Sequence, residues 1–148
     1  MSFFGITMGD PCGIGPEIIL KAFKSKPELM DNSIIFGSFE ILSFYNTKFN
    51  MGFDINKIGS LEDCKSRYIN VFDPYPVNVD HITIGQASVI GGKCAFMYVK
   101  SAIDFALKKK ITTIVTAPLN KEALHMAGYN YAGHTEIFAE FTHGDSYA

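Results

Sequence analysis

The chain has 148 residues, of which 47% are hydrophobic and 19% are charged, and its formal net charge is −2. This composition indicates a single globular domain with a core and argues against disorder. The small net charge gives no reason to expect nucleic acid or an anionic membrane as a partner, and the short apolar runs exclude a membrane-spanning helix.

Strand-like and helix-like segments alternate along the chain. Short apolar runs predict buried strands, whereas apolar residues at helical spacing predict helices, and in 16–25 that spacing puts Ile18, Ile19, Ala22 and Phe23 on one face. The expected strands are 3–8, 33–38, 67–73 and 112–118, and the expected helices are 16–25, 39–49, 93–110, 120–128 and a last one that begins near Glu136. The intervals 48–66 and 74–92 show no clear pattern, and the second is expected to leave the main sheet.

This alternation predicts an α/β fold with a largely parallel sheet that is covered on both faces. The start of the chain lacks the basic region of a signal peptide. Its three cysteines are widely spaced and form no C-x-x-C pair, which is typical of reduced thiols. We therefore expect a cytoplasmic protein.

The stretch GDPCGIGP (9–16) follows the first expected strand and precedes a helix. Gly13 and Gly15 allow positive φ or the close approach of a partner, and Pro16 suits the first helical position. Ligands bind at this edge of open α/β sheets, so the loop is a candidate binding segment. It matches neither a Walker A loop nor G-x-G-x-x-G, and a purely structural turn explains the spacing equally well. Asp10 either orients a ligand or caps its own loop.

A second stretch, GHTE (133–136), places an imidazole and a hydroxyl where a helix is expected to begin. The free N–H groups of a helix N-terminus suit a phosphate or a carboxylate. His134 and Thr135 are therefore candidate ligand-binding residues. The structural alternative is that Thr135 caps the helix and His134 is a satisfied structural residue. Lys121 is better explained as a solvated first-turn lysine than as an anion partner.

The stretches ITMGDPCGIGPEI (6–18), GQASVIGGKCAFMYVKSAIDFAL (85–107), TAPLNKEAL (116–124) and GHTE together resemble the N-terminal part of the 4-hydroxythreonine-4-phosphate dehydrogenase family of vitamin B6 (pyridoxal phosphate) biosynthesis. Cys12 stands where that family usually has alanine, which is a small-for-small change. The resemblance implies a three-layer α/β/α fold like that of isocitrate and isopropylmalate dehydrogenases. It also implies a homodimer with its site at the subunit interface.

The activity implied by the resemblance is a metal-assisted oxidation. An oxidoreductase of this family passes hydride from 4-phosphohydroxy-L-threonine to NAD or NADP, and the β-keto acid then loses carbon dioxide to give 3-amino-2-oxopropyl phosphate. A divalent metal (Zn, Mg or Co) would steady the developing alkoxide. The family's substrate-binding His-Thr pair falls on His134 and Thr135. Which residues bind the dinucleotide is unknown.

The family's three metal-binding histidines, and the lysine, asparagine and arginine that complete its substrate site, lie beyond residue 148. We expect residues 1–148 to be the N-terminal portion of a single dehydrogenase chain, without catalytic or metal-binding residues and inactive alone. His81, His125 and His143 show no metal-ligand spacing. One alternative is a related dehydrogenase of phosphorylated threonate or erythronate. Another is a non-catalytic anion-binding α/β module that uses loop 9–16 and the 133–136 corner.

Overall fold

A computed structural model describes residues 2–142 of the chain. The strands are β1 (Phe4–Thr7), β2 (Ser33–Phe36), β3 (Ile55–Ile58), β4 (Ile69–Phe72) and β5 (Thr113–Thr116). The α-helices are α1 (Gly15–Ser25), α2 (Phe39–Lys48), α3 (Val89–Leu107), α4 (Lys121–Met126) and α5 (His134–Thr142). Three short 3-10 helices are η1 (Pro27–Asn32), η2 (Leu61–Asp63) and η3 (Val79–His81).

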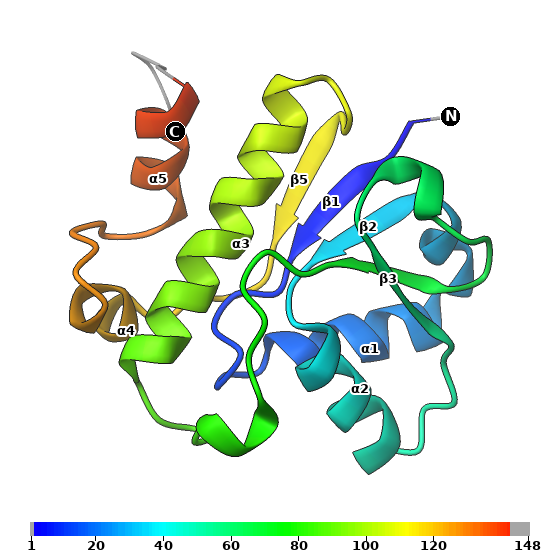
Figure 1. Ribbon diagram of the computed structural model, residues 1–148, viewed down its shortest axis with the longest axis horizontal. Helices are drawn as coiled ribbons and strands as arrows, with labels where there is room; N and C mark the ends of the chain where they lie inside the picture. Colours follow the sequence, from blue (N-terminus) through cyan, green and yellow to red (C-terminus); the bar gives the residue numbers. More distant parts are fainter. Residues whose placement is uncertain (1, 143–148) are drawn as a thin grey trace.

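The strands form one parallel sheet in the order β3-β4-β2-β1-β5 (Figure 1). Strand β1 lies between two partners that are far apart in the sequence, because Phe4 pairs with both Ser33 of β2 and Thr113 of β5. The chain leaves β1 toward β2 on one side, while β5 joins β1 on the other. The loops that follow β1 and β5 therefore diverge at the carboxyl edge of the sheet.

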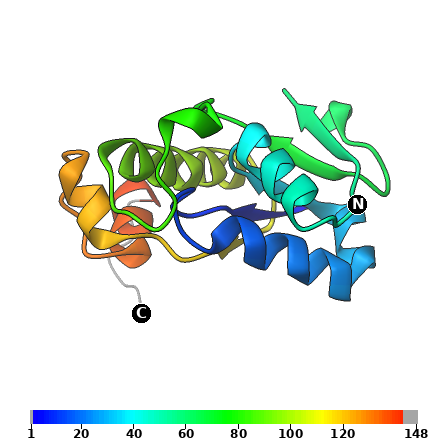
Figure 2. The same cartoon turned by 90° about the horizontal axis from the view of Figure 1, so that it is seen from below.

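Helices cover both faces of the sheet, which gives the expected three-layer α/β/α arrangement (Figure 2). Helix α3 packs across β1, β2 and β5 on one face, and α1 lies on the other with α2 beside it. Helices α4 and α5 pack against α3. None of the helices within residues 2–142 is both long and apolar enough to cross a membrane.

The main core lies between the sheet and its helices. Strand β2 is buried throughout, and it brings Ile34, Ile35 and Phe36 into the centre of this core. The ring of Phe36 packs edge-on against Phe105 of α3, with the ring centroids 5.0 Å apart. A buried strand of this kind needs apolar residues at consecutive positions, because both of its faces are covered.

Several boundaries differ from the sequence predictions. The patternless interval 48–66 contains β3, a fifth strand at the edge of the sheet. Helix α3 begins at Val89, four residues before its expected start at 93, and ends at Leu107. The interval 74–92 contributes no strand to the sheet, in agreement with expectation.

One prediction of burial was wrong. Strand β5 is largely exposed, because it forms the other edge of the sheet within the described residues. On α1, the predicted shared face is observed, because all four residues border one groove: Ile19 and Phe23 are buried, and Ile18 and Ala22 are exposed. These exposed residues line an apolar groove between α1 and β5, which we call the α1–β5 groove. Its wall is formed by Phe4, Ile6, Ile18, Ile19, Ala22, Phe23, Leu29, Val115, Thr116 and Ala117.

Candidate functional site

A pocket of about 250 Å³ opens at the carboxyl edge of the sheet, where the loops after β1 and β5 diverge. This is the position at which open α/β sheets bind ligands. Three segments that are distant in the sequence form its wall: Asp10, Cys12, Gly13 and Ile14 from the first loop; Gly85 and Gln86 from the segment before α3; and Pro118, Leu119 and Asn120 from the loop after β5. We call it the edge pocket.

The path of the loop after β1 depends on its glycines. Gly9 has a φ of 73°, a left-handed conformation that other residues adopt at a cost. A Cβ built on Gly15 would lie 1.9 Å from the carbonyl oxygen of Met8, so no larger residue fits there. The amide of Asp10 donates to the carbonyl of Pro118 at 3.3 Å, which ties the loop after β1 to the loop after β5. The predicted close approach is thus confirmed at Gly15, where the partner is the protein's own backbone.

The segment before α3 closes the pocket from the other side. The amide of Gly85 donates to the carbonyl of Cys12 at 2.7 Å, and the Cys12 Sγ lies 3.7 Å from the Ser88 Oγ. Ser88 also caps α3 by accepting from the amide of Gly91 at 3.0 Å. A Cβ on Gly91 would lie 2.6 Å from the Asp10 Oδ1, so the carboxylate packs directly against the first turn of α3.

Two titratable side chains in the edge pocket are desolvated. Asp10 is 4% exposed, and its burial raises the pKa of the carboxyl group, although the hydrogen bond from the Cys12 amide at 2.8 Å opposes this shift. Burial likewise raises the pKa of the Cys12 thiol. At neutral pH Cys12 is therefore a packed thiol rather than a reactive thiolate.

The predicted pair His134 and Thr135 forms the first turn of α5. The Nε2 of His134 is buried and has no hydrogen-bond partner within residues 2–142, and desolvation lowers the pKa of this imidazole. Thr135 is exposed and lies inside the helix, so it is not the cap. Instead, Glu136 accepts from the amide of Ala132 at 2.8 Å at this helix start.

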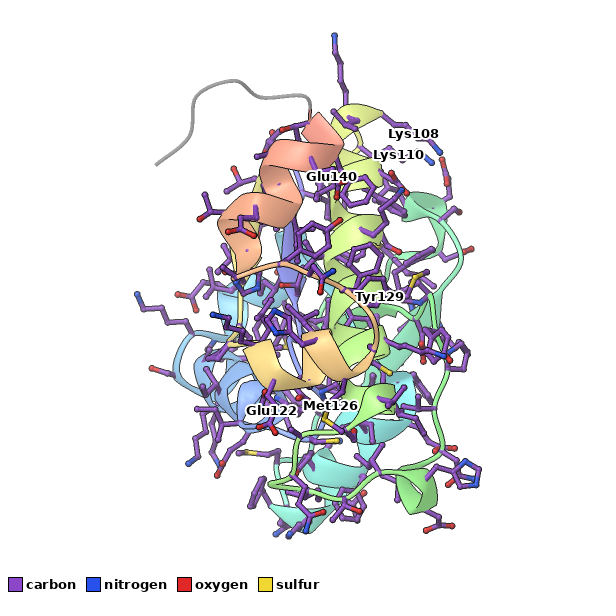
Figure 3. All side chains as sticks on the ribbon, turned by 90° about the vertical axis from the view of Figure 1, so that its left-hand side faces the viewer. Lys108, Lys110, Glu122, Met126, Tyr129 and Glu140 are labelled. Atoms are coloured by element: carbon purple, nitrogen blue, oxygen red, sulfur yellow. The ribbon has the colours of Figure 1, made fainter. Side chains whose placement is uncertain are left out.

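The pair and the edge pocket lie at different levels of α3. Ile137 of α5 packs with Phe96, Val99 and Ile103, which lie along the middle of α3, whereas the pocket lies beside its first turn. The ring of Tyr129, between α4 and α5, stacks on Phe96 with the ring centroids 3.9 Å apart. Figure 3 shows α4, Tyr129 and α5 following one another along this side of α3. Neither His134 nor Thr135 lines the edge pocket.

Three of the remaining candidate residues lie on the surface. His81, Lys121 and His125 are exposed, and His143 lies outside the described residues. Within residues 2–142, no three His, Cys, Asp or Glu side chains are grouped as metal ligands. A larger, open hollow of about 640 Å³ lies between α2 and η3. Its Glu40 already accepts from the Val79 amide.

The fold defines an open-sheet α/β protein with a pocket at the switch point of its sheet. A family model described as pyridoxal phosphate biosynthetic protein PdxA matches residues 29–148. The chain belongs to this family. Sequence reasoning identified the family from stretches that include Gly85, Gln86 and residues 118–120. It did not assign these residues to a pocket, because no local pattern relates them to loop 9–16.

Named relatives agree with this assignment. The D-threonate 4-phosphate dehydrogenase of Salmonella typhimurium is 37% identical over 146 residues, which are 97% of this chain and 45% of that protein. A 4-hydroxythreonine-4-phosphate dehydrogenase structure from Klebsiella pneumoniae is 33% identical with a TM-score of 0.89, and the match covers 97% of this chain and 45% of that one.

A 4-hydroxythreonine-4-phosphate dehydrogenase structure from Burkholderia phymatum is 34% identical with a TM-score of 0.88, and the match covers 99% of this chain and 45% of that one. A terephthalate 1,2-cis-dihydrodiol dehydrogenase structure from Burkholderia xenovorans is 21% identical with a TM-score of 0.69, and it shares the fold over 88% of this chain and 38% of its own. The chain thus spans less than half of the length of each of these proteins.

Proposed function

We propose that this chain is the N-terminal portion of a homodimeric, NAD- or NADP-dependent dehydrogenase of a four-carbon phosphorylated hydroxy acid. Membership in the PdxA family carries the proposal, because the relatives are named as dehydrogenases of 4-hydroxythreonine 4-phosphate and D-threonate 4-phosphate. Both compounds carry a carboxylate at C1, a hydroxyl at C3 and a phosphate at C4. They differ at C2, which bears an amine in the first and a hydroxyl in the second.

The reaction class follows from that shared chemistry. Oxidation of the C3 hydroxyl transfers a hydride from C3 to the nicotinamide and a proton from the oxygen to a base. The product is a β-keto acid, which loses C1 as carbon dioxide. From 4-phosphohydroxy-L-threonine this gives 3-amino-2-oxopropyl phosphate, in the pathway to pyridoxal phosphate. A divalent metal bound outside the described residues would supply Lewis-acid stabilisation of the C3 oxygen.

The role that we assign to His134 and Thr135 is substrate binding. The buried Nε2 of His134 has no partner within residues 2–142, and Thr135 exposes its hydroxyl on the first turn of α5. A free imidazole nitrogen beside a helix N-terminus is suited to hold an anionic oxygen of the substrate. In the neutral state that its lowered pKa favours, His134 contributes a hydrogen bond rather than a full charge.

Kinetics of the full-length protein test this role. His134→Ala should lower kcat/KM about 2- to 150-fold, since the hydrogen bond is worth roughly 0.5–3 kcal/mol. Thr135→Val keeps the shape, loses the hydroxyl and should act in the same direction. Metal affinity should change little in either variant. Unaltered kinetics in both variants, with only a lower melting temperature, would remove the pair from the site.

A second candidate is D-threonate 4-phosphate as the substrate, which is favoured by the name of the Salmonella typhimurium relative. Comparing kcat/KM for the two phosphorylated acids decides between them. The non-catalytic anion-binding alternative gains no support from loop 9–16. Among the described residues, the wall of the edge pocket beside it contains the Asp10 carboxylate and no lysine, arginine or histidine.

A further inference from the structure

The loop between α4 and α5 leads directly into the helical turn that carries His134 and Thr135. Gly133 immediately precedes this turn, and glycine restrains the backbone less than any other residue. The position of the pair therefore depends on contacts that the loop makes with its surroundings. Tyr131, three residues before His134, supplies three such contacts.

Three parts of Tyr131 contact three different helices. Its ring lies nearly parallel to that of Phe96 in α3, with 6.0 Å between the ring centroids and 8° between the ring planes. Its carbonyl accepts from the Nε2 of His125 in α4 at 3.2 Å. Its hydroxyl donates to the carboxylate of Glu140, which Figure 3 shows on α5. Tyr131 thus joins α3, α4 and α5 just before the pair.

The ring on which Tyr131 rests is itself well fixed. Phe96 is buried on α3, and its ring also contacts Tyr129, which precedes the pair, and Phe141, which follows it. Ile137, one turn beyond His134, is fully buried in the same apolar cluster. Segments on both sides of the pair are therefore held against α3. Binding groups supported by a packed helix are placed more precisely than groups on an unsupported loop.

We propose that Tyr131 is a positioning residue for substrate binding, which fixes where the imidazole of His134 and the hydroxyl of Thr135 meet the substrate. This inference rests on the proposed function, which assigns the pair to the substrate. Tyr131 acts through the pair, because its own ring and hydroxyl are engaged within the protein. Misplacement of a binding group by about 1 Å can cost roughly 100-fold in rate, so loss of this anchor should be visible in kinetics.

Steady-state kinetics of the full-length protein with the two phosphorylated acids test this role. Tyr131→Phe keeps the ring, loses the contact with Glu140 and should lower kcat/KM about 2- to 5-fold. Tyr131→Leu also loses the ring and should lower kcat/KM about 5- to 50-fold. Tyr68→Phe is the matched control, because Tyr68 directly precedes β4, toward the opposite edge of the sheet, and should leave kcat/KM unchanged. Tyr131→Phe should melt as the unaltered protein does, since the lost hydrogen bond is exposed.

A second comparison separates positioning from a purely structural role. In a protein that already carries His134→Ala and Thr135→Val, Tyr131→Leu should change kcat/KM less than about 2-fold, because the groups that it positions are gone. A structural role would lower kcat/KM by the same factor in both backgrounds. Equal factors, or unchanged kinetics in both Tyr131 variants, would overturn the inference and leave the proposed function standing. Unchanged kinetics on replacing the pair, or no turnover of either acid by the unaltered protein, would overturn the proposal on which the inference rests and the inference with it.

Discussion

Glycines set the closest approaches in this molecule. At Gly92, in the second turn of α3, an added Cβ would lie 1.9 Å from the carbonyl oxygen of Ala123 and 3.0 Å from the Cβ of Ala127. The missing side chain allows α4 to lie directly against α3. Since Asn120 caps α4 and also lines the edge pocket, this helix contact helps to place one wall of the pocket.

Gly92→Ala should therefore destabilise the fold. Alanine gains up to about 1 kcal/mol of helix propensity over glycine, but here its methyl group would meet backbone and force α3 and α4 apart. We expect a net loss of about 1–3 kcal/mol in the free energy of unfolding, measured by urea denaturation. The control is Gly133→Ala, where an added Cβ meets nothing within 4 Å and stability should stay within about 0.5 kcal/mol. Equal stability of the two variants would contradict the close approach.

At the scale of the elements, the most unusual feature is the exposed edge strand β5. Val115 is 48% exposed, and it borders the α1–β5 groove together with Ile18, which is 43% exposed. Natural edge strands are blunted by charges, prolines or bulges, but Thr113–Thr116 has no charged residue or proline. An apolar groove beside an unguarded strand favours association with other chains.

We expect the isolated 148-residue chain to dimerise or aggregate, and Val115→Lys to reduce this tendency. A lysine on the exposed strand adds charge that is costly to bury in a contact between chains. Sedimentation velocity at micromolar concentration measures the effect. Leu107→Lys is the matched control, because Leu107 is also exposed (56%) but lies at the end of α3, away from the groove. A compact monomer before any substitution would refute the expectation.

The elements also show what could be predicted from the sequence. Alternating apolar runs and helical periodicities predicted the α/β fold, because β2 is buried throughout and α3 buries most of its apolar residues. Strand β3 was missed, since an edge strand with the sequence INKI has two polar residues and no apolar run. The start of α3 was predicted too late because Gly91 and Gly92 are poor helix formers. The helix has glycine at these two positions because Asp10 and α4 pack too closely there for a side chain.

For the candidate site, local signals were enough only for the loop after β1. The glycines and prolines of this loop predict a constrained turn from the sequence alone. The hydrogen bond between Gly85 and Cys12 joins positions that no periodicity relates, so the pocket wall could not be predicted. The burial of β5 was overestimated because an apolar strand predicts a covering layer on both faces, whereas among the described residues α3 packs against only one face of it.

For the whole molecule, the expected division of the active-site residues between this chain and the sequence beyond residue 148 leads to a prediction about activity. We expect the 148-residue chain alone to show no dehydrogenase turnover, because the resemblance places the metal-binding histidines and the remaining substrate contacts beyond it. The assay uses 4-phosphohydroxy-L-threonine or D-threonate 4-phosphate, NAD or NADP, and a divalent metal. The full-length protein in the same assay is the control. Turnover by the isolated chain near the rate of the full-length protein would contradict the prediction.

The pairing of β1 with β5 has a consequence for synthesis on the ribosome. The Thr112 hydroxyl donates to the Phe3 carbonyl across 109 residues of sequence, so β1 stays incomplete until β5 has been made. At about 5–20 residues per second, that interval lasts roughly 5–20 s. Throughout this time the nascent chain has one edge of β1 open, and contacts of such long range form slowly. Of the strands in this chain, the first to be made is therefore among the last to be completed, and chaperones that bind nascent chains have their longest access to it.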